Sequence, residues 1–251
     1  MEFNYENKQY LKMLEDLNPY FYNKYITFIK KFIENKNNRF MDIGCGNGNV
    51  LAPLVADGYK NVYGCDISKL FIDSAKIRGL ENVFWYDGGK IPFEDNSFDI
   101  VGSFGVLEHT ESPINFLKEH IRLVKSGGHI IITCPNLLTV FFKLGNPRVD
   151  TLKKRLKNIP IIFKKIFSNK VDFEKVRPII NNNFYPDDDV ITIANLIDII
   201  RLFKRNNCKI IYSDGFMINN GIIYKIIGSI PILKYFLPSC FVVIKKKYEY
   251  L

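Results

Sequence analysis

The sequence predicts an α/β fold in which helices cover both faces of a mostly parallel β-sheet. Between residues 39 and 136, short apolar runs alternate with helical patterns, which is typical of parallel sheets. Some runs, such as residues 130–132, are apolar throughout, as expected for strands covered on both sides. The 251 residues are 47% hydrophobic and 24% charged, which suits a globular chain of one large domain.

Apolar spacing places the individual elements. The predicted strands are 39–43, 62–66, 83–86, 98–103, 129–134, 209–212 and 241–244. Residues 5–35 have apolar side chains at helical spacing, and Pro19 divides them, which predicts two helices before the first strand.

A glycine-rich turn follows the first strand and leads into a helix that should begin near Asn49. Its glycines are Gly44, Gly46 and Gly48. Glycine permits a sharp turn and lets the backbone approach a ligand, and the start of a helix offers free N–H groups to polar or anionic atoms. The pattern therefore predicts a site for a nucleotide-like ligand at the carboxyl end of the sheet.

The spacing of the glycines distinguishes between nucleotides. A dinucleotide-binding loop would have its third glycine at position 49, where this chain has Asn49. A nicotinamide-dependent oxidoreductase is therefore the least favoured alternative. Asp66 ends the second strand, at the distance from the loop where a carboxylate accepts ribose hydroxyls. Asp87 ends the third strand.

Three further motifs complete an ordered set of six. They are Ile91–Val101 (IPFEDNSFDIV), Val106–Pro113 (VLEHTESP) and Leu123–Thr133 (LVKSGGHIIIT). Together with the glycine loop, Asp66 and Asp87, they resemble the motifs of class I S-adenosylmethionine-dependent methyltransferases. The resemblance is strongest to methyltransferase type 11 and to ubiquinone-biosynthesis methyltransferases, and it covers residues 39–136.

The resemblance implies a Rossmann-like sheet of seven strands, with the last strand antiparallel at the edge and a basic helical insertion between strands five and six. We expect one methyltransferase domain over residues 1–251. Its parts would be N-terminal helices (1–38), the cofactor-binding core (39–136), the insertion or lid (137–186), and a final helix with strands six and seven (187–251).

S-adenosylmethionine is the cofactor that the resemblance implies. Asp42 would orient the glycine loop around the methionine part, Asp66 would hold the ribose, and Asp87 with Gly88 would lie beside the adenine. The implied cofactor-binding residues are Asp42, Gly44, Cys45, Gly46, Gly48, Asp66, Ile67, Asp87, Gly88 and Phe104. No metal ligands are expected.

The best candidate for a general base is His109, which follows strand four at the end of the sheet where methyl transfer occurs in this family. The alternative is that His109 supports or caps neighbouring structure. Glu108 is the second candidate, with Glu111 and Tyr185 behind it. We expect His120 and His129 to be structural.

Positive charge is concentrated in the second half of the chain. Residues 1–139 hold 15 Lys and Arg against 17 Asp and Glu, a net charge of −2, and residues 140–251 hold 20 against 9, a net charge of +11. Residues 151–167 mix apolar and basic side chains, and Pro160 predicts two short amphipathic helices there. They could form a solvated lid over the active site or meet an anionic lipid or phosphate.

Residues after the insertion complete the sheet. Asp187, Asp188 and Asp189 are expected to cap a helix whose buried stripe runs from Val190 to Phe203. Residues 221–238 are apolar, but lysines and prolines interrupt them, so we do not expect a membrane span.

The predicted function is O-methylation of a small molecule, a saccharide or a lipid-linked intermediate. A quinone-type lipid acceptor and a non-catalytic adenosyl-binding partner protein are the alternatives. Nucleic acid is not expected, because residues 103–106 (Ser-Phe-Gly-Val) lack the motifs of adenine-N6 and cytosine-C5 enzymes and no RNA-binding module is present.

Scattered cysteines and a polar start predict a cytoplasmic protein, or one peripheral to the inner face of a membrane. The sequence leaves the oligomeric state open.

Overall fold

A computed structural model describes residues 4–18, 20–33, 35–140, 151–179, 188–215 and 232–248. Backbone contacts divide the chain into two compact units. The first contains Met1–Phe104, Leu117–Ile131 and Lys246–Leu251, and the second contains Gly105–Phe116 and Ile132–Lys245. The division into one domain with four parts stays a prediction.

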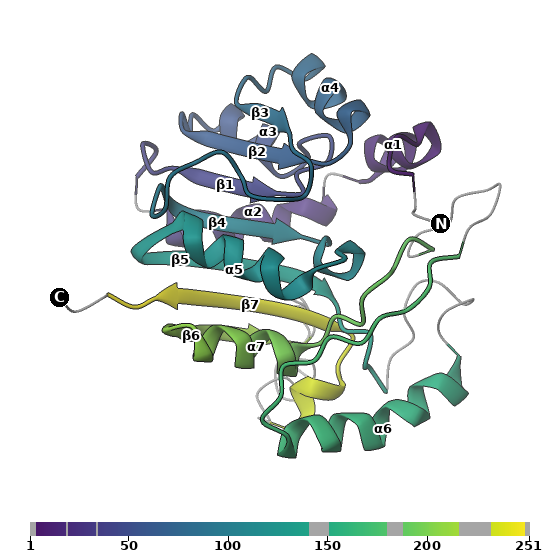
Figure 1. The fold of residues 1–251 in the computed structure, drawn as a ribbon. Helices are drawn as coiled ribbons and strands as arrows, with labels where there is room; N and C mark the ends of the chain where they lie inside the picture. The colour runs from purple at the N-terminus through teal and green to yellow at the C-terminus, as the bar shows by residue number, and fades with distance from the viewer. Residues whose placement is uncertain are drawn as a thin grey trace. The chain divides into compact units, whose positions relative to one another are not determined.

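Seven strands form one sheet in the order β3-β2-β1-β4-β5-β7-β6, with β7 antiparallel (Figure 1). The strands are β1 (Phe40–Ile43), β2 (Val62–Asp66), β3 (Val83–Trp85), β4 (Phe98–Phe104), β5 (Val124–Pro135), β6 (Cys208–Asp214) and β7 (Ser239–Lys246). The predicted fold class is confirmed, and so is each of the seven strands. The largest difference in a boundary is at β5, which begins at Val124, whereas the strand was predicted to begin at residue 129.

The helices alternate with the strands. They are α1 (Lys8–Asp16), α2 (Tyr20–Phe32), α3 (Leu51–Ala56), α4 (Lys69–Ile77), α5 (Pro113–Leu123), α6 (Leu152–Phe167) and α7 (Leu196–Arg205), with short 3-10 helices η1 (Leu107–His109) and η2 (Leu233–Phe236). The two predicted N-terminal helices are confirmed, and Pro19 lies outside the described residues. The helix after the glycine loop begins at Leu51, slightly later than predicted.

Parallel register in the first unit aligns the carboxyl ends of its strands. Ile43 of β1 pairs with Cys65 of β2, and Asp66 pairs with Trp85 of β3. All four residues of β1 are buried, which makes this strand the centre of the unit. The residues that follow each strand therefore gather at one edge of the sheet.

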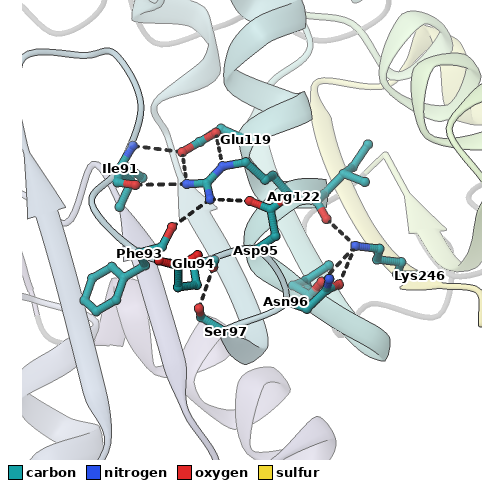
Figure 2. A network of polar contacts seen from close by, with 11 residues as sticks. Ile91, Phe93, Glu94, Asp95, Asn96, Ser97, Glu119, Arg122 and Lys246 are labelled. Atoms are coloured by element: carbon teal, nitrogen blue, oxygen red, sulfur yellow. Dashed lines mark hydrogen bonds and ion pairs between the residues drawn. The ribbon is translucent and has the colours of Figure 1, made fainter.

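A network of polar contacts in the first unit holds the loop before β4 against α5 (Figure 2). The Arg122 guanidinium donates to the carboxylate of Glu119, to Asp95 Oδ1 and to the carbonyls of Ile91 and Phe93. Burial alone would raise the pKa of Glu119, but hydrogen bonds from Arg122 and from the Ile91 N–H outweigh it and leave that pKa below its usual value.

Lys246, at the end of β7, makes the second part of this network. Its Nζ donates to Asn96 Oδ1 at 2.8 Å, to the Ile121 carbonyl at 2.9 Å and to the Val124 carbonyl at 3.1 Å. The residue is 8% exposed. A buried ammonium thus donates three hydrogen bonds, one of them to the buried carbonyl of Val124.

The structure contradicts the prediction of two short helices in the insertion. Residues 152–167 form one helix, α6, with Pro160 inside it. Proline removes one helical hydrogen bond, at a cost of about 3 kcal/mol in an ordinary helix. The carbonyl four residues earlier belongs to Leu156, which is exposed, so water can replace the missing donor. Burial of the opposite side of α6 offsets the remaining cost.

The prediction of a helix opened by Asp187, Asp188 and Asp189 is also wrong. Helix α7 begins later, at Leu196, and its N-cap is Asn195, whose Oδ1 accepts the Asp198 N–H at 2.9 Å. Backbone hydrogen bonds to other segments hold residues 191–193 in extended form. Those bonds replace the ones that a helix would have made.

Some predictions fall outside the described residues. They concern Tyr185, Asp187 and the apolar run at 221–231. Within the described ranges, no helix is both long and apolar enough to cross a membrane.

Replacement of Lys246 by methionine should lower the free energy of unfolding by about 1–3 kcal/mol, because three acceptors lose their donor and one of them, the Val124 carbonyl, is buried. Lys125→Met is the matched control: this lysine pairs with Asp99 at 2.7 Å but its side chain is 43% exposed, so the loss should stay below about 1 kcal/mol. Urea unfolding of both variants measures the difference. Equal losses would contradict a buried clamp at Lys246.

Candidate active site

The glycine loop of the first unit is built on left-handed backbone. Gly44, Gly46 and Gly48 have φ values of 79°, 54° and 79°. A Cβ on Gly48 would lie 2.1 Å from the Leu80 side chain, so this glycine permits close packing inside the protein. A Cβ on Gly46 would meet only Leu14, at 3.5 Å. Gly46 is therefore the position where the protein leaves the loop open.

Asp66 connects β2 to the glycine loop. Its Oδ2 accepts the Gly46 N–H at 2.9 Å and its Oδ1 accepts the Ser68 N–H at 2.9 Å. Burial raises the pKa of Asp66 to about 6, although both hydrogen bonds act in the opposite direction. A carboxylate has about four acceptor positions, so Asp66 keeps acceptor capacity for a ligand.

Two more polar groups at the loop are buried without a hydrogen-bond partner among the described residues: Asp42 Oδ1 and Asn47 Nδ2. Burial raises the pKa of Asp42 well above its usual value, and the neighbouring Asp66 carboxylate raises it further. Buried polar atoms are nearly always paired. An acceptor and a donor left over at a glycine loop are what a polar ligand would satisfy.

Asn49 fastens the N-terminal helices to the loop. Its Nδ2 donates to the Leu14 carbonyl of α1 at 2.8 Å, and its Oδ1 accepts from Arg78 at 2.7 Å. A hydrogen bond also links its side chain to Tyr22 of α2. The residue that breaks the dinucleotide pattern thus has a structural role that glycine could not fill.

Glu6, just before α1, caps the start of α4. Its two carboxylate oxygens accept the N–H groups of Lys69 and Leu70 at 2.6 Å and 3.0 Å. This places the N-terminal segment next to the residues that follow Asp66. The sequence did not point to Glu6, Asn49 or Arg78, because capping by distant residues leaves no local pattern.

The third strand contributes exposed side chains. Asp87 is exposed and its Oδ1 accepts the Gly89 N–H at 2.9 Å. Ile67 and Trp85 are exposed apolar residues joined by a hydrogen bond from the indole N–H to the Ile67 carbonyl at 2.7 Å. Gly88 has a φ of 83°, and a Cβ there would lie 3.8 Å from Ile67. These residues form an apolar surface with one carboxylate beside it.

The remaining residues assigned to the cofactor also lie near the ends of strands. Cys45 is buried in the loop, and its N–H donates to the Cys65 carbonyl at 3.0 Å. Burial raises the pKa of its thiol well above the usual value. Phe104 ends β4, and its ring centroid lies 5.2 Å from that of Tyr25 on α2.

In the second unit, His109 lies between two buried carboxylates. Its Nδ1 is 3.2 Å from Asp189 Oδ2, and its Nε2 is 3.7 Å from Glu108 Oε1. Both acidic side chains are almost fully buried. The residue expected to cap a helix, Asp189, is thus a neighbour of the histidine.

An extended segment after the insertion holds this turn in place. The N–H groups of Ile191 and Thr192 both donate to the Glu108 carbonyl at 3.0 Å, and the Thr192 hydroxyl donates to the Thr110 carbonyl at 2.6 Å. Lys175 donates to the same carbonyl and to the Thr192 hydroxyl. The turn therefore depends on residues far away in sequence.

The other two histidines and the five cysteines have structural roles. His120 is fully buried on α5, and the His129 ring packs 4.9 Å from that of Phe32. The five cysteines are free and buried. Among the described residues, no group of three or more His, Cys, Asp or Glu could hold a metal ion.

A family model described as a methyltransferase domain matches residues 41–132, from the glycine loop through most of β5. Residues 41–132 form a class I S-adenosylmethionine-dependent methyltransferase domain. S-adenosylmethionine is accordingly its methyl donor.

The relatives of this methyltransferase carry names that refer to different activities. It is 27% identical to an uncharacterised protein of Methanocaldococcus jannaschii, over 87% of this chain and 82% of that protein. It is 32% identical to a ubiquinone biosynthesis O-methyltransferase of Dechloromonas aromatica, over 50% and 54%. It is 36% identical to a tRNA U34 carboxymethyltransferase of Vibrio cholerae, over 39% and 32%. The chain spans about half the length of the ubiquinone biosynthesis O-methyltransferase and less of the tRNA U34 carboxymethyltransferase.

Solved structures of methyltransferases share the fold. One is a chain of the complex between the Haloferax volcanii Trm112 methyltransferase activator and a methyltransferase, with a TM-score of 0.58, 16% identity and coverage of 96% and 94%. Another is an S-adenosylmethionine-dependent methyltransferase from Listeria monocytogenes, with a TM-score of 0.58, 15% identity and coverage of 90% and 99%. At these identities the likeness is one of fold alone.

The residues of the first unit fit the methyl donor. The open position at Gly46, the free acceptor capacity of Asp66 and the leftover polar atoms of Asp42 and Asn47 match a ligand with hydroxyl, amino and carboxylate groups. The apolar surface at Ile67 and Trp85 suits a flat ring.

Gly46→Ala should weaken binding of S-adenosylmethionine by about tenfold or more, because the new methyl group enters space that the protein leaves open. Gly79→Ala is the matched control, since Gly79 also has a left-handed φ, 83°, and nothing lies within 4 Å of its Cβ position. Both variants should lose similar stability through backbone strain. Calorimetric titration separates the two effects, and equal affinity in both would contradict the assignment of the loop.

Proposed function

We propose that the chain transfers a methyl group to a hydroxyl of a small molecule, a saccharide or a lipid-linked intermediate, with a quinone-type lipid as the nearest alternative. The observation that supports a hydroxyl acceptor is the buried Asp189–His109–Glu108 arrangement. A hydroxyl has to lose its proton when it is methylated, and an oriented imidazole is suited to accept it.

In the proposed mechanism, residues of the first unit hold the donor. The loop at Gly44, Gly46 and Gly48 would bind the methionine part, with Asp42 nearby. Asp66 would accept the ribose hydroxyls. The bound S-adenosylmethionine would supply an electrophilic methyl group on its sulfonium. The protein contributes mainly by positioning the donor and the acceptor.

The adenine would lie at the end of the third strand. Ile67, Asp87 and Gly88 form the proposed contacts there, and Trp85 adds apolar surface. Cys45 and Phe104 complete the set of proposed cofactor contacts.

His109 would act as the base. The Asp189 carboxylate beside Nδ1 favours the tautomer with its proton on that atom, which leaves the lone pair of Nε2 for the proton of the acceptor. Glu108, next to Nε2, would stabilise the imidazolium that forms. Asp189 is a positioning residue in this scheme, since it would act through the histidine.

Two other readings remain as proposals. A non-catalytic adenosyl-binding partner would share the cofactor loop but would not need an oriented histidine. A relative named for tRNA raises a nucleic-acid acceptor, although residues 103–106 lack the motifs of base methyltransferases. A protein partner is a further proposal, because one solved structure with this fold is a complex with the Trm112 activator.

Transfer of label from methyl-tritiated S-adenosylmethionine tests the function. The acceptor panel contains quinols, free saccharides, polyprenyl-linked saccharides and tRNA. We expect an alkali-stable methyl ether on a hydroxyl-bearing acceptor. Label found only on tRNA would overturn the proposed acceptor class. Binding of the cofactor without transfer to any acceptor would favour the non-catalytic alternative.

Binding of the cofactor should weaken as pH falls below about 6, by up to about tenfold per pH unit. The reason is that ionised Asp66 accepts the ribose hydroxyls, and the free protein protonates this carboxylate as pH falls through its raised pKa. Asp66→Asn should bind more weakly by on the order of 1–3 kcal/mol at neutral pH. It should also lose the pH dependence. Calorimetry between pH 5 and 8, roughly the range around this pKa, provides the measurement; an unchanged slope in the variant would remove Asp66 from the ribose site.

His109→Gln should slow methyl transfer by about a hundredfold or more while leaving cofactor affinity unchanged. Asp189→Asn should slow it less and should move the acidic limb of the kcat profile to lower pH, because the imidazolium loses a stabilising anion. Glu81→Gln, which changes an exposed carboxylate of the first unit, is the control and should do neither. A profile that does not move in Asp189→Asn would leave Asp189 with a structural role only.

A further inference from the structure

Helix α6 has one side fixed inside the second unit. Asn158 Nδ2 donates to the carbonyls of Leu137 and Thr139 at 3.2 Å and 3.1 Å, and Lys165 Nζ donates to Asp198 Oδ2 at 2.7 Å. Ile162 is fully buried in a cluster with residues of α7, of η2 and of the chain after β5, namely Ile197, Phe236, Leu138 and Val140. These contacts determine which side of α6 faces outward.

The outward side carries an apolar stripe along the whole helix. At 100° per residue, its members fall within an arc of about 80° and extend over about 22 Å. They are Leu152, Leu156, Pro160, Phe163 and Phe167. Leu152, Leu156 and Phe167 are 61%, 52% and 83% exposed. This side of α6 therefore presents large apolar side chains that the described protein leaves uncovered.

A basic row adjoins the stripe. Lys153, Lys157 and Lys164 are exposed and lie within the next arc of about 40°. None of the three has an ion-pair partner among the described residues. We call the stripe and the row together the outer face of α6.

We infer that the outer face of α6 docks on the surface of an anionic lipid bilayer. Apolar side chains next to lysines match the boundary between acyl chains and negatively charged headgroups, where long lysine side chains keep their ammonium in the headgroup layer. The net charge of +11 over residues 140–251 adds attraction to such a surface. The inference does not depend on methyl transfer or on the identity of the acceptor.

A lid over the active site explains the outer face less well. A lid would direct its large apolar side chains inward, whereas the buried side of α6 is formed by isoleucines and by the polar contacts of Asn158 and Lys165. A protein partner would need no row of lysines alongside the stripe unless it were acidic. Charge and apolarity arranged in two parallel rows favour a bilayer.

The first experiment is sedimentation of the full chain with vesicles of phosphatidylcholine, with and without phosphatidylglycerol. We expect binding to the anionic vesicles only, weakening with salt. The double variant Leu156→Ser with Phe167→Ser should reduce affinity by about tenfold or more. The matched control, Val55→Ser with Ile77→Ser, removes exposed apolar side chains from the first unit and should bind as the wild type does.

A second pair of variants separates local charge from net charge. Replacing Lys153, Lys157 and Lys164 by glutamine should reduce affinity by about tenfold or more. Replacing Lys60, Lys76 and Lys118, which are exposed elsewhere, changes the net charge equally and should have little effect. Equal losses in both triple variants would show nonspecific attraction and would overturn the assignment of the surface.

Insertion of the stripe can be observed directly. The chain has one tryptophan, Trp85, so Trp85→Phe combined with Phe167→Trp places a single reporter on the outer face. Its emission should shift to the blue and be quenched by brominated lipid when anionic vesicles are added. A reporter that stays in water, or a chain that forms dimers through the stripe and does not bind vesicles in sedimentation equilibrium, would overturn the inference.

Discussion

A buried carboxylate at the end of β2 organises the first unit. Asp66 receives the N–H of Gly46 from the loop and the N–H of Ser68 from the start of α4, so it joins the glycine loop to the next helix. Burial opposes its charge, and the two hydrogen bonds reduce that cost. The arrangement requires the parallel register of β1 and β2, which brings Gly44 and Asp66 to the same edge. The position of the loop, the start of α4 and the cap supplied by Glu6 all depend on it.

The second unit holds a histidine beside two buried carboxylates. The turn at 107–109 is too short to fix a side chain by itself. Two N–H groups from residues 191 and 192 converge on the Glu108 carbonyl, and Lys175 closes the same turn from the other strand of the extended pair. Lys175 of the insertion and the segment after the insertion thus support the turn together, which relates the extra length of this chain to its proposed chemistry.

Packing fixes one side of helix α6 and leaves the opposite side exposed. Its buried side combines isoleucines with a lysine paired to Asp198. That burial sustains a helix through Pro160, a residue that would break a helix of this length in water. The freedom of the opposite side is what permits a second role there, because residues that do not support the fold can be selected for contact with a surface.

The sequence alone determined the sheet, the family and the residues at the ends of the strands. Strongly periodic apolar runs and glycines followed by acidic residues are local signals, and each strand and the glycine loop were found from them. The helix at Asp187–Asp189 and the break at Pro160 were predicted wrongly, because both were judged from local propensity, which packing outweighed.

Only the tertiary structure determined which residues far apart in the sequence contact one another. Asn49 contacts Leu14 and Arg78, and Asp189 lies beside His109, in each case across a long stretch of chain. The tertiary structure also decided that the α6 stripe faces outward, since an amphipathic pattern shows two faces but not which of them is buried. Local composition cannot specify such pairings, because they arise when separate segments compete to bury apolar surface and to satisfy the same polar atoms.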